Sequence, residues 1–131
     1  MREILFRGKS IYGDWFYGDL INLTKKIKEI CNHSQLEHSH SVNPETVGQY
    51  TGLTDKNGKK IFEGDIVVMK IKGYNTICKV VWADNVAQFQ LWQTNTIPNT
   101  PTALNLGNYD CEVLGNIHDN PELSEECEQN A

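Results

Sequence analysis

The distribution of apolar and polar residues along this chain predicts short β-strands separated by turns. Residues 3–8 and 15–21 are rich in β-branched and aromatic side chains, and glycines interrupt the segment between them. This pattern favours an N-terminal hairpin over residues 3–22, with Trp15 and Tyr17 on one face of its second strand. The two rings can serve as a platform for a base or a peptide, although rings in small β domains more often pack in the core.

Residues 23–41 show no consistent period and are expected to form an exposed loop or insert. Their first part fits a short helix and a short strand equally well, and the rest is polar. The segment holds the weak metal-ligand candidates Cys31, His33, His38 and His40. Their spacing matches no common zinc signature, so histidines without a metal role are the preferred interpretation and no metal site is expected.

The segment 42–69 has the densest turn chemistry in the chain. Asn43 is a good helix N-cap, and the ring of Pro44 presets the backbone for a first helical position. These residues predict a single helical turn at 44–47, which ends at Gly48.

Two further turns are predicted in the same segment. Asn57-Gly58 predicts a hairpin with a type I′ turn, because both residues tolerate positive φ. Gly64 permits a left-handed or bulged backbone, and Asp65 can accept hydrogen bonds from amides at the same bend.

Alternating apolar residues continue this pattern towards the C-terminus. Strands are expected near residues 49–53, 60–62, 66–72, 76–82, 88–92 and 111–116. Short successive strands joined by Gly and Asn turns are typical of a small antiparallel barrel, which we place at 42–118 beside an accessory N-terminal hairpin. A second Asn-Pro-Glu sequence predicts a short C-terminal helix over 120–127. The fold class is therefore mainly β, with a single domain over residues 1–131.

Four segments of the chain carry a family resemblance. They are ILFRGK (4–9), DWFYGDL (14–20), NPETVGQYTGLTDKNGKKIFEGDIV (43–67) and VLGNIHDNPEL (113–123). In these segments the sequence resembles the YopX family of small phage and prophage proteins. The resemblance implies a β-rich fold with an SH3-like barrel, and it brings no established catalytic residues.

Composition narrows the class of protein. No apolar run approaches the roughly 20 residues that a membrane helix needs, so no membrane partner is expected. Charges within the first ten residues argue against a secretory signal, which predicts a cytoplasmic protein in the host cell. The chain has four cysteines without a C-x-x-C pair, which are expected to be free thiols.

Charge is distributed unevenly. The formal net charge is −5, yet residues 1–79 hold all 12 basic and nine acidic side chains, whereas residues 80–131 hold eight acids and no base. Such a split can serve a partner-binding face or contacts between subunits. Half of the eight acids lie in an acidic tail, so a coincidental split is the preferred interpretation.

Catalytic chemistry finds little support, and neither a catalytic residue nor a cofactor is expected. A strand cysteine with His118 offers a nucleophile and a base, but no third residue to orient them. The carboxylates near glycines are explained by turn capping. They are Asp14, Asp19, Glu63 and Asp65. A small hydrolase or a metal-binding protein is therefore a minor alternative.

Single-stranded nucleic-acid binding is the main alternative function. Lys56, Lys59 and Lys60 cluster at the predicted hairpin, and Trp82 and Trp92 can stack on bases. The acidic balance of the chain argues against it, because nucleic-acid-binding domains are usually basic.

A protein-binding role fits best. Small β domains present sheet edges, aromatic surface and loops that bind peptides or form oligomers. We therefore expect a non-catalytic phage or prophage accessory protein that binds a host or phage protein, or forms a homo-oligomer. The candidate binding residues are Trp15, Tyr17, Lys56, Lys59, Lys60, Trp82 and Trp92.

Overall fold

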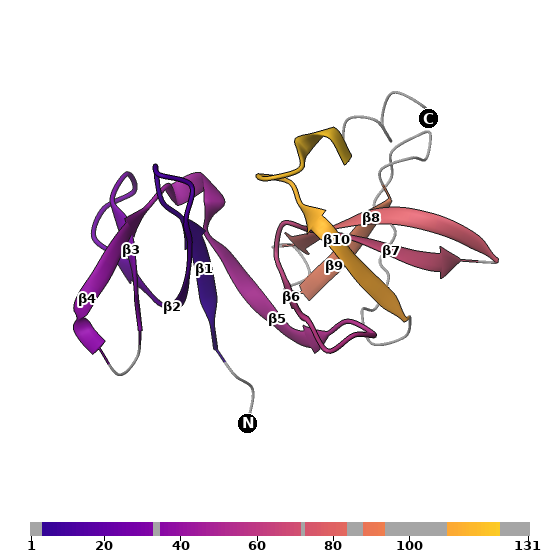
Figure 1. The fold of residues 1–131 in the computed structure, drawn as a ribbon, viewed down its shortest axis with the longest axis horizontal. Coiled ribbons are helices and arrows are strands. Elements are labelled where there is room, and N and C mark those ends of the chain that lie inside the picture. Colours follow the sequence, from indigo (N-terminus) through magenta and orange to yellow (C-terminus); the bar gives the residue numbers. More distant parts are fainter. Residues whose placement is uncertain (1–3, 33–34, 72, 84–87, 94–109, 124–131) are drawn as a thin grey trace. The chain divides into compact units, whose positions relative to one another are not determined.

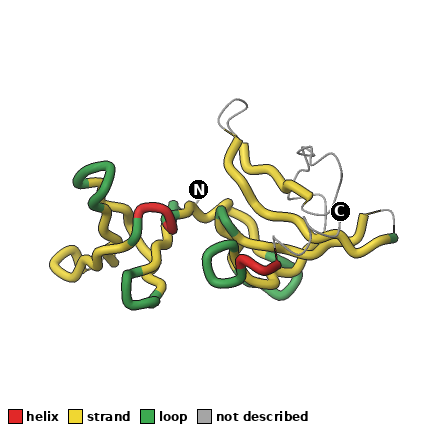
Figure 2. Tube along the Cα trace, turned by 90° about the horizontal axis from the view of Figure 1, so that it is seen from above, coloured by secondary structure: helices red, strands yellow, loops and turns green. Residues whose placement is uncertain are grey.

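A computed structural model of the chain describes residues 4–32, 35–71, 73–83, 88–93 and 110–123 (Figure 1). The described elements are almost all strands, paired antiparallel, so the expectation of a mainly β fold is confirmed. Short loops join many of them, as Figure 2 shows. Within the described ranges, no helix is both long and apolar enough to cross a membrane.

Ten strands and one short helix have the following bounds: β1 (Phe6–Lys9), β2 (Trp15–Asn22), β3 (Lys28–Asn32), β4 (Gln35–Val42), η1 (Pro44–Thr46), β5 (Gly48–Thr54), β6 (Lys60–Phe62), β7 (Asp65–Ile71), β8 (Tyr74–Ala83), β9 (Gln88–Gln93) and β10 (Cys111–Asn116). The first sheet has the order β4-β3-β2-β1-β5-β6, and the second has the order β10-β7-β8-β9.

The strand pairings correct the expected SH3-like barrel over residues 42–118. Those pairings that the described residues make form two open sheets and close no barrel. The N-terminal hairpin is also central instead of accessory, because β5 pairs with β1 through Phe6↔Gln49 and Arg7↔Gly48. A pairing between segments some 40 residues apart leaves no trace in local periodicity.

The chain divides into two compact units, which are residues 1–52 and residues 53–131. We call them the N-terminal unit and the C-terminal unit. Each has its own buried side chains and is described by itself.

Strand β2 organises the N-terminal unit, because two partners share it. Its first half, Trp15–Gly18, pairs with β1, and its second half, Asp19–Asn22, pairs with β3. The N-terminal hairpin is thus confirmed. The far end of β4 returns to β1, where the Asn43 N–H donates to the Lys9 carbonyl oxygen at 2.8 Å.

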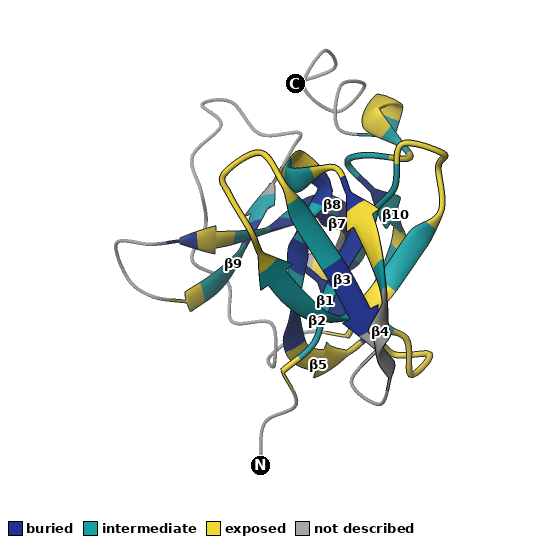
Figure 3. Ribbon diagram, turned by 90° about the vertical axis from the view of Figure 1, so that its left-hand side faces the viewer, coloured by how far each residue is buried: buried dark blue, intermediate teal, exposed yellow. Residues whose placement is uncertain are grey.

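Strands β3 and β4 occupy much of the expected loop over residues 23–41. The segment forms a hairpin, and Figure 3 shows a buried stretch of β3 in dark blue. Ile30 and Cys31 are buried, and Val42 at the end of β4 is buried too. Gly8 packs so closely on Val42 that an added Cβ would come within 2.8 Å of it. The polar residues of β4 concealed the strand, because its sequence lacks the apolar alternation on which the prediction depends.

The helical turn is confirmed as the short helix η1. The Asn43 side chain accepts a hydrogen bond from the Glu45 N–H at 3.1 Å, and Pro44 follows it directly. Thr46 fastens the turn to β1, because its hydroxyl oxygen accepts from the Lys9 N–H at 2.8 Å.

The β5–β6 hairpin forms as expected, but its turn lies one residue earlier than predicted. The Gly58 N–H donates to the Asp55 carbonyl at 3.0 Å, so Lys56 and Asn57 are the central residues of the turn. Gly58 follows with φ of 83°. This is the pattern of a three-residue loop that ends in a left-handed glycine.

The bend between β6 and β7 follows the prediction. Gly64 has φ of 91°, and its N–H donates to the Val80 carbonyl at 2.9 Å. Asp65 is 2% exposed, and its Oδ2 accepts from the Phe62 N–H at 2.7 Å. The buried Asp65 carboxylate therefore stabilises this bend.

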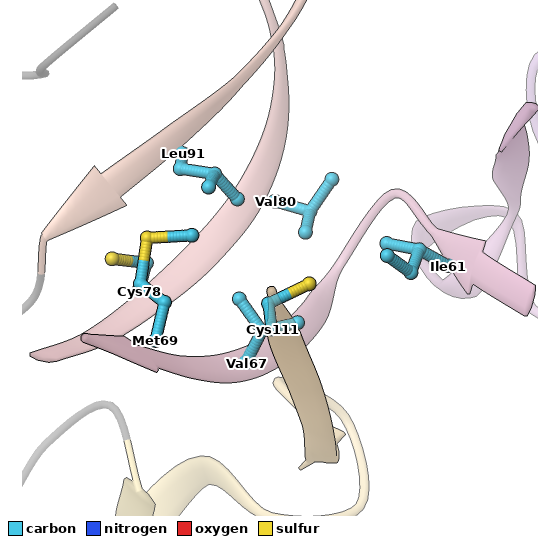
Figure 4. Packing of buried hydrophobic residues seen from close by; sticks show 7 residues of the cluster. All are labelled: Ile61, Val67, Met69, Cys78, Val80, Leu91 and Cys111. Atoms are coloured by element: carbon cyan, nitrogen blue, oxygen red, sulfur yellow. The ribbon is translucent and has the colours of Figure 1, made fainter. Parts of the chain in front are cut away.

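A compact apolar cluster fills the C-terminal unit. Residues from β6 to β10 contribute to it, and Figure 4 shows their side chains turned towards one another. Phe89 and Val113 pack against its side. The buried members are Ile61, Val67, Met69, Cys78, Val80, Leu91 and Cys111.

The segment after β10 is a turn built on Asn116. Its side-chain oxygen accepts from the N–H groups of His118 and Asp119, at 3.0 and 2.9 Å. Residues 121–123 are helical, at the start of the helix expected over 120–127. Residues 124–127 lie outside the described ranges.

Candidate binding surface

One face of the β1–β2 hairpin combines aromatic and basic side chains. Arg7 lies opposite Tyr17 in the register, and Lys9 lies opposite Trp15. Directly opposed residues of an antiparallel pair share a face, and so do alternate residues of one strand. The structure therefore confirms that Trp15 and Tyr17 share a face, and it adds two cations that the sequence had not assigned to them.

Both cations lie near the Trp15 ring. The Arg7 guanidinium carbon lies 4.8 Å from the ring centroid, and Lys9 Nζ lies 6.0 Å from it. The Arg7 distance is well within the range of cation–π attraction, and the Lys9 distance is at its outer limit. Trp15 is half-buried, whereas Tyr17 keeps 52% of its surface exposed.

The loop that joins β1 to β2 displays two large apolar side chains. Ile11 is 84% exposed and Tyr12 is 85% exposed. The loop is nonetheless closed by hydrogen bonds, because the Ser10 N–H donates to the Asp14 carbonyl at 2.9 Å. We call residues 10–14 the hairpin tip. The sequence carries one signal for it, an Ile-Tyr pair inside the loop of the predicted hairpin.

Trp82 and Trp92 do not form one platform. Trp82 pairs with Phe89 and Trp92 pairs with Lys79, so the two indoles lie on opposite faces of the β8–β9 hairpin. Trp82 meets Phe89 edge-to-face at 4.9 Å and is 40% exposed. The Lys79 ammonium lies 5.9 Å from the Trp92 ring.

One of the three hairpin lysines lies beside an acidic side chain. Lys56 Nζ lies 3.5 Å from Glu112 Oε2, so an acidic side chain of β10 offsets its charge. Lys59 is exposed, and Lys60 is half-buried at the start of β6. The C-terminal unit that carries them has six basic and eleven acidic side chains, a formal net charge of −5.

The turn beside these lysines is fastened to β10. Asp55 is 6% exposed and accepts from the N–H groups of Asn57, Lys59 and Val113, at 2.9, 2.9 and 3.0 Å. Burial alone raises the pKa of Asp55, but these three hydrogen bonds and the Lys59 charge outweigh it and leave the pKa below its ordinary value. The carboxylate holds the hairpin in place.

The candidate metal ligands that the structure describes do not converge. Cys31 pairs with Ser39 and His40 pairs with Ile30, so Cys31 and His40 lie on opposite faces of the sheet. Cys31 is buried, and the His40 ring stacks on Phe16 at 3.9 Å. The side chains of His33 and His38 lie outside the described residues. Among the groups that are described, no cluster of three or more His, Cys, Asp or Glu is arranged to hold a metal ion.

The strand cysteines lie in the apolar core instead of at a reactive surface. Cys78 is fully buried, and Cys111 is 2% exposed. Burial, with a further contribution from the Asp55 charge, raises the pKa of the Cys111 thiol. A thiol that resists ionisation is a poor nucleophile, because the thiolate is the reactive form.

The sequence model of the YopX family, described as "YopX protein", matches residues 6–125. The chain belongs to the YopX family. The match spans both compact units and confirms the resemblance carried by the four motifs. No curated protein matches this YopX-family chain.

A solved structure supports the fold. It is the "Crystal structure of protein EF1440 from Enterococcus faecalis", with a TM-score of 0.52 and 23% sequence identity. The similarity covers 95% of this chain and 99% of that chain. At this identity the likeness concerns the fold alone.

Proposed function

We propose that this YopX-family protein is a non-catalytic binding module that acts through protein–protein contacts made by its N-terminal unit. One observation carries the proposal. Nine large hydrophobic side chains are exposed among the described residues, and six of them belong to the N-terminal unit. These six are Ile4, Ile11, Tyr12, Tyr17, Leu23 and Ile27.

The charge of the same unit supports this role. Residues 1–52 hold six basic and six acidic side chains, so the unit is formally neutral. A unit without net charge that exposes several large apolar side chains favours association with another protein, because burying those side chains removes apolar area from water.

The two alternatives find less support. Lys56 lies beside Glu112 on an acidic unit, an arrangement that disfavours a nucleic-acid backbone. The two buried cysteines of the C-terminal unit are part of its apolar core, and the buried carboxylates Asp55 and Asp65 accept hydrogen bonds from backbone amides. These groups stabilise the fold, which favours a binding role over a catalytic one. The partner is a host or phage protein.

An affinity recovery with and without nuclease tests the proposal. Tagged protein is recovered from the host cell, and each co-purifying protein is produced separately and titrated against the purified chain. We expect a partner that survives nuclease treatment and binds in the two-component titration. Loss of the partner on nuclease treatment overturns the proposal in favour of nucleic-acid binding, and recovery of no binding partner overturns it outright.

A further inference from the structure

We propose that the hairpin tip is the anchor of this contact, and that Ile11 and Tyr12 insert into an uncharged apolar pocket of the partner protein. This inference rests on the proposed function and names the residues and the pocket chemistry. Ile11 and Tyr12 are the most exposed large hydrophobic residues described, at 84% and 85%, and they are adjacent in sequence. The next most exposed, Ile4, is at 67%.

Hydrogen bonds within the tip restrain its backbone. The Ser10 hydroxyl oxygen accepts from the N–H groups of Tyr12 and Asp14, at 3.2 and 3.3 Å. The Gly13 N–H donates to the Ser10 carbonyl at 3.0 Å, and Gly13 takes the left-handed φ of 91° that the reversal requires. Ile11 and Tyr12 are therefore displayed by an ordered turn.

Order at the tip matters for affinity. A contact residue whose backbone is restrained before binding loses less conformational freedom when the complex forms. A tyrosine contributes a large contact area with few rotatable bonds, and its hydroxyl can form a hydrogen bond at the end of an apolar pocket. An aliphatic residue beside it adds apolar area. This pair has the composition of a compact interface anchor.

The charge around the tip identifies the pocket. No charged residue lies between Ser10 and Asp14, so the inserted residues have no ion to pair with and favour an uncharged pocket. Nucleic acid is disfavoured, since phosphate contacts need cations at the point of contact. Loops that bind anionic lipid carry an excess of cations. The Asp14 charge offsets the charge of Lys9 on the other side of the tip, so a membrane surface is disfavoured.

The variant Ile11→Ser/Tyr12→Ser removes the anchor, and Leu53→Ser/Leu114→Ser is its control. Leu53 and Leu114 are exposed apolar residues of the C-terminal unit, at 37% and 44% exposure. No binding role is proposed for that unit, so the control tests whether the loss of two exposed apolar side chains is by itself enough to weaken binding.

A photoreactive phenylalanine replaces Tyr12 in one protein and Leu114, an exposed residue of the C-terminal unit, in a control protein. Host cells that produce each protein are irradiated. The protein that crosslinks from position 12 alone is then purified and titrated by calorimetry against wild type and both variants. We expect the dissociation constant to rise about 30-fold or more for Ile11→Ser/Tyr12→Ser, and less than about 3-fold for the control. Thermal unfolding of both variants should match wild type, because the substituted side chains are exposed.

The remaining outcomes separate this inference from the proposed function. A partner that binds Ile11→Ser/Tyr12→Ser as tightly as wild type overturns the anchor and leaves the protein-binding role intact. Absence of any partner overturns both. Position 12 could instead crosslink to a second copy of this chain, with a dimer in sedimentation that Ile11→Ser/Tyr12→Ser abolishes. That result overturns the inference in favour of self-association. Tip-dependent binding to vesicles of phosphatidylcholine and phosphatidylserine assigns the tip to a membrane surface and also overturns the inference.

Discussion

The two compact units differ in how they use polar and apolar residues. The N-terminal unit is formally neutral, and its described residues expose six large hydrophobic side chains. The C-terminal unit has a net charge of −5, and its described residues expose three. The C-terminal unit instead buries two carboxylates, Asp55 and Asp65, against backbone amides. Buried polar groups of the C-terminal unit therefore stabilise the fold, and apolar side chains of the N-terminal unit remain exposed, as the proposed binding role requires.

This contrast explains why the longest family motif contributes so little to the binding surface. The motif at 43–67 contains η1, the Asp55 turn and the Gly64 bend. Each of these features satisfies backbone groups where the chain reverses. The candidate binding residues of the hairpin tip lie outside that motif, on a loop joining two of the central strands.

The largest effect is expected from removal of the Asp55 carboxylate. Asp55→Ala leaves the amides of Asn57, Lys59 and Val113 without their acceptor, so we expect the free energy of unfolding to fall by about 3 kcal/mol. Urea denaturation measures the loss. Pulsed alkylation locates it, because Cys78 and Cys111 report on the C-terminal unit and Cys31 reports on the N-terminal unit.

The alkylation rates of the three thiols are measured in a protein that carries Cys127→Ser. Cys127 lies outside the described residues. We expect Cys78 and Cys111 of Asp55→Ala to react at lower urea than Cys31. Equal exposure of all three thiols would show that the two units unfold together and would contradict the division. Asp55→Asn, which keeps one acceptor oxygen, should lose about half as much.

Acid provides an independent check on Asp55. Its pKa is lower in the folded state than in the unfolded chain, where an aspartate has a pKa of about 4. Ionised Asp55 therefore stabilises the fold above about pH 4, and the contribution is lost as the pH falls through the folded-state pKa. Asp55→Asn should show a smaller decline in stability over that window than wild type. An identical decline would show that other groups carry the acid sensitivity.

An intermediate effect is expected in the N-terminal unit from Gly8→Ala. The added Cβ would lie 2.8–3.1 Å from three side-chain atoms of Val42, which is buried and stiff because it is β-branched. We expect a loss of about 2 kcal/mol. In this variant Cys31 should react at lower urea than Cys78 and Cys111, the reverse of the Asp55→Ala order.

The double variant Gly8→Ala/Val42→Ala controls for the clash. Removing the Val42 methyl groups makes room for the added Cβ, so the double variant should be more stable than the sum of the two single effects predicts. Strict additivity would show that Gly8 is required for a reason other than its contact with Val42.

Local chemistry could be predicted from the sequence, and long-range pairing could not. Asn43-Pro44 and Gly64-Asp65 identified a helical turn and a bend, because a short run of residues satisfies its own backbone there. The pairing of β1 with β5 depends on segments that are distant in sequence. The β3–β4 hairpin was missed for a different reason, since the residues of β4 do not alternate between apolar and polar.

The candidate surface shows the same limit. Alternation along β2 correctly placed Trp15 and Tyr17 on one face. The cations beside Trp15 come from β1, and only the register of the two strands brings them to it. Exposure of Ile11 and Tyr12 also had no local signal beyond the turn itself, because burial depends on what the rest of the chain covers.

The smallest effect is expected from the ion pair of Lys56 with Glu112. Both side chains are about half exposed, at 52% and 42%, so Lys56→Gln should change the free energy of unfolding by less than about 0.5 kcal/mol. The backbone connection survives the substitution, because the Lys56 N–H donates to the Cys111 carbonyl at 2.9 Å whatever the side chain. Urea denaturation beside Glu112→Gln measures the effect.

The Lys56→Gln variant also tests whether Lys56, Lys59 and Lys60 of the acidic C-terminal unit bind nucleic acid. If the lysines serve no nucleic acid, a single-stranded oligonucleotide should show no salt-sensitive retardation with wild type or with Lys56→Gln. Retardation that Lys56→Glu/Lys59→Glu/Lys60→Glu abolishes would give the C-terminal unit a binding role of its own. The contrast between a binding N-terminal unit and a structural C-terminal unit would then fail, because an exposed lysine can serve a phosphate even when its ion pair adds little to stability.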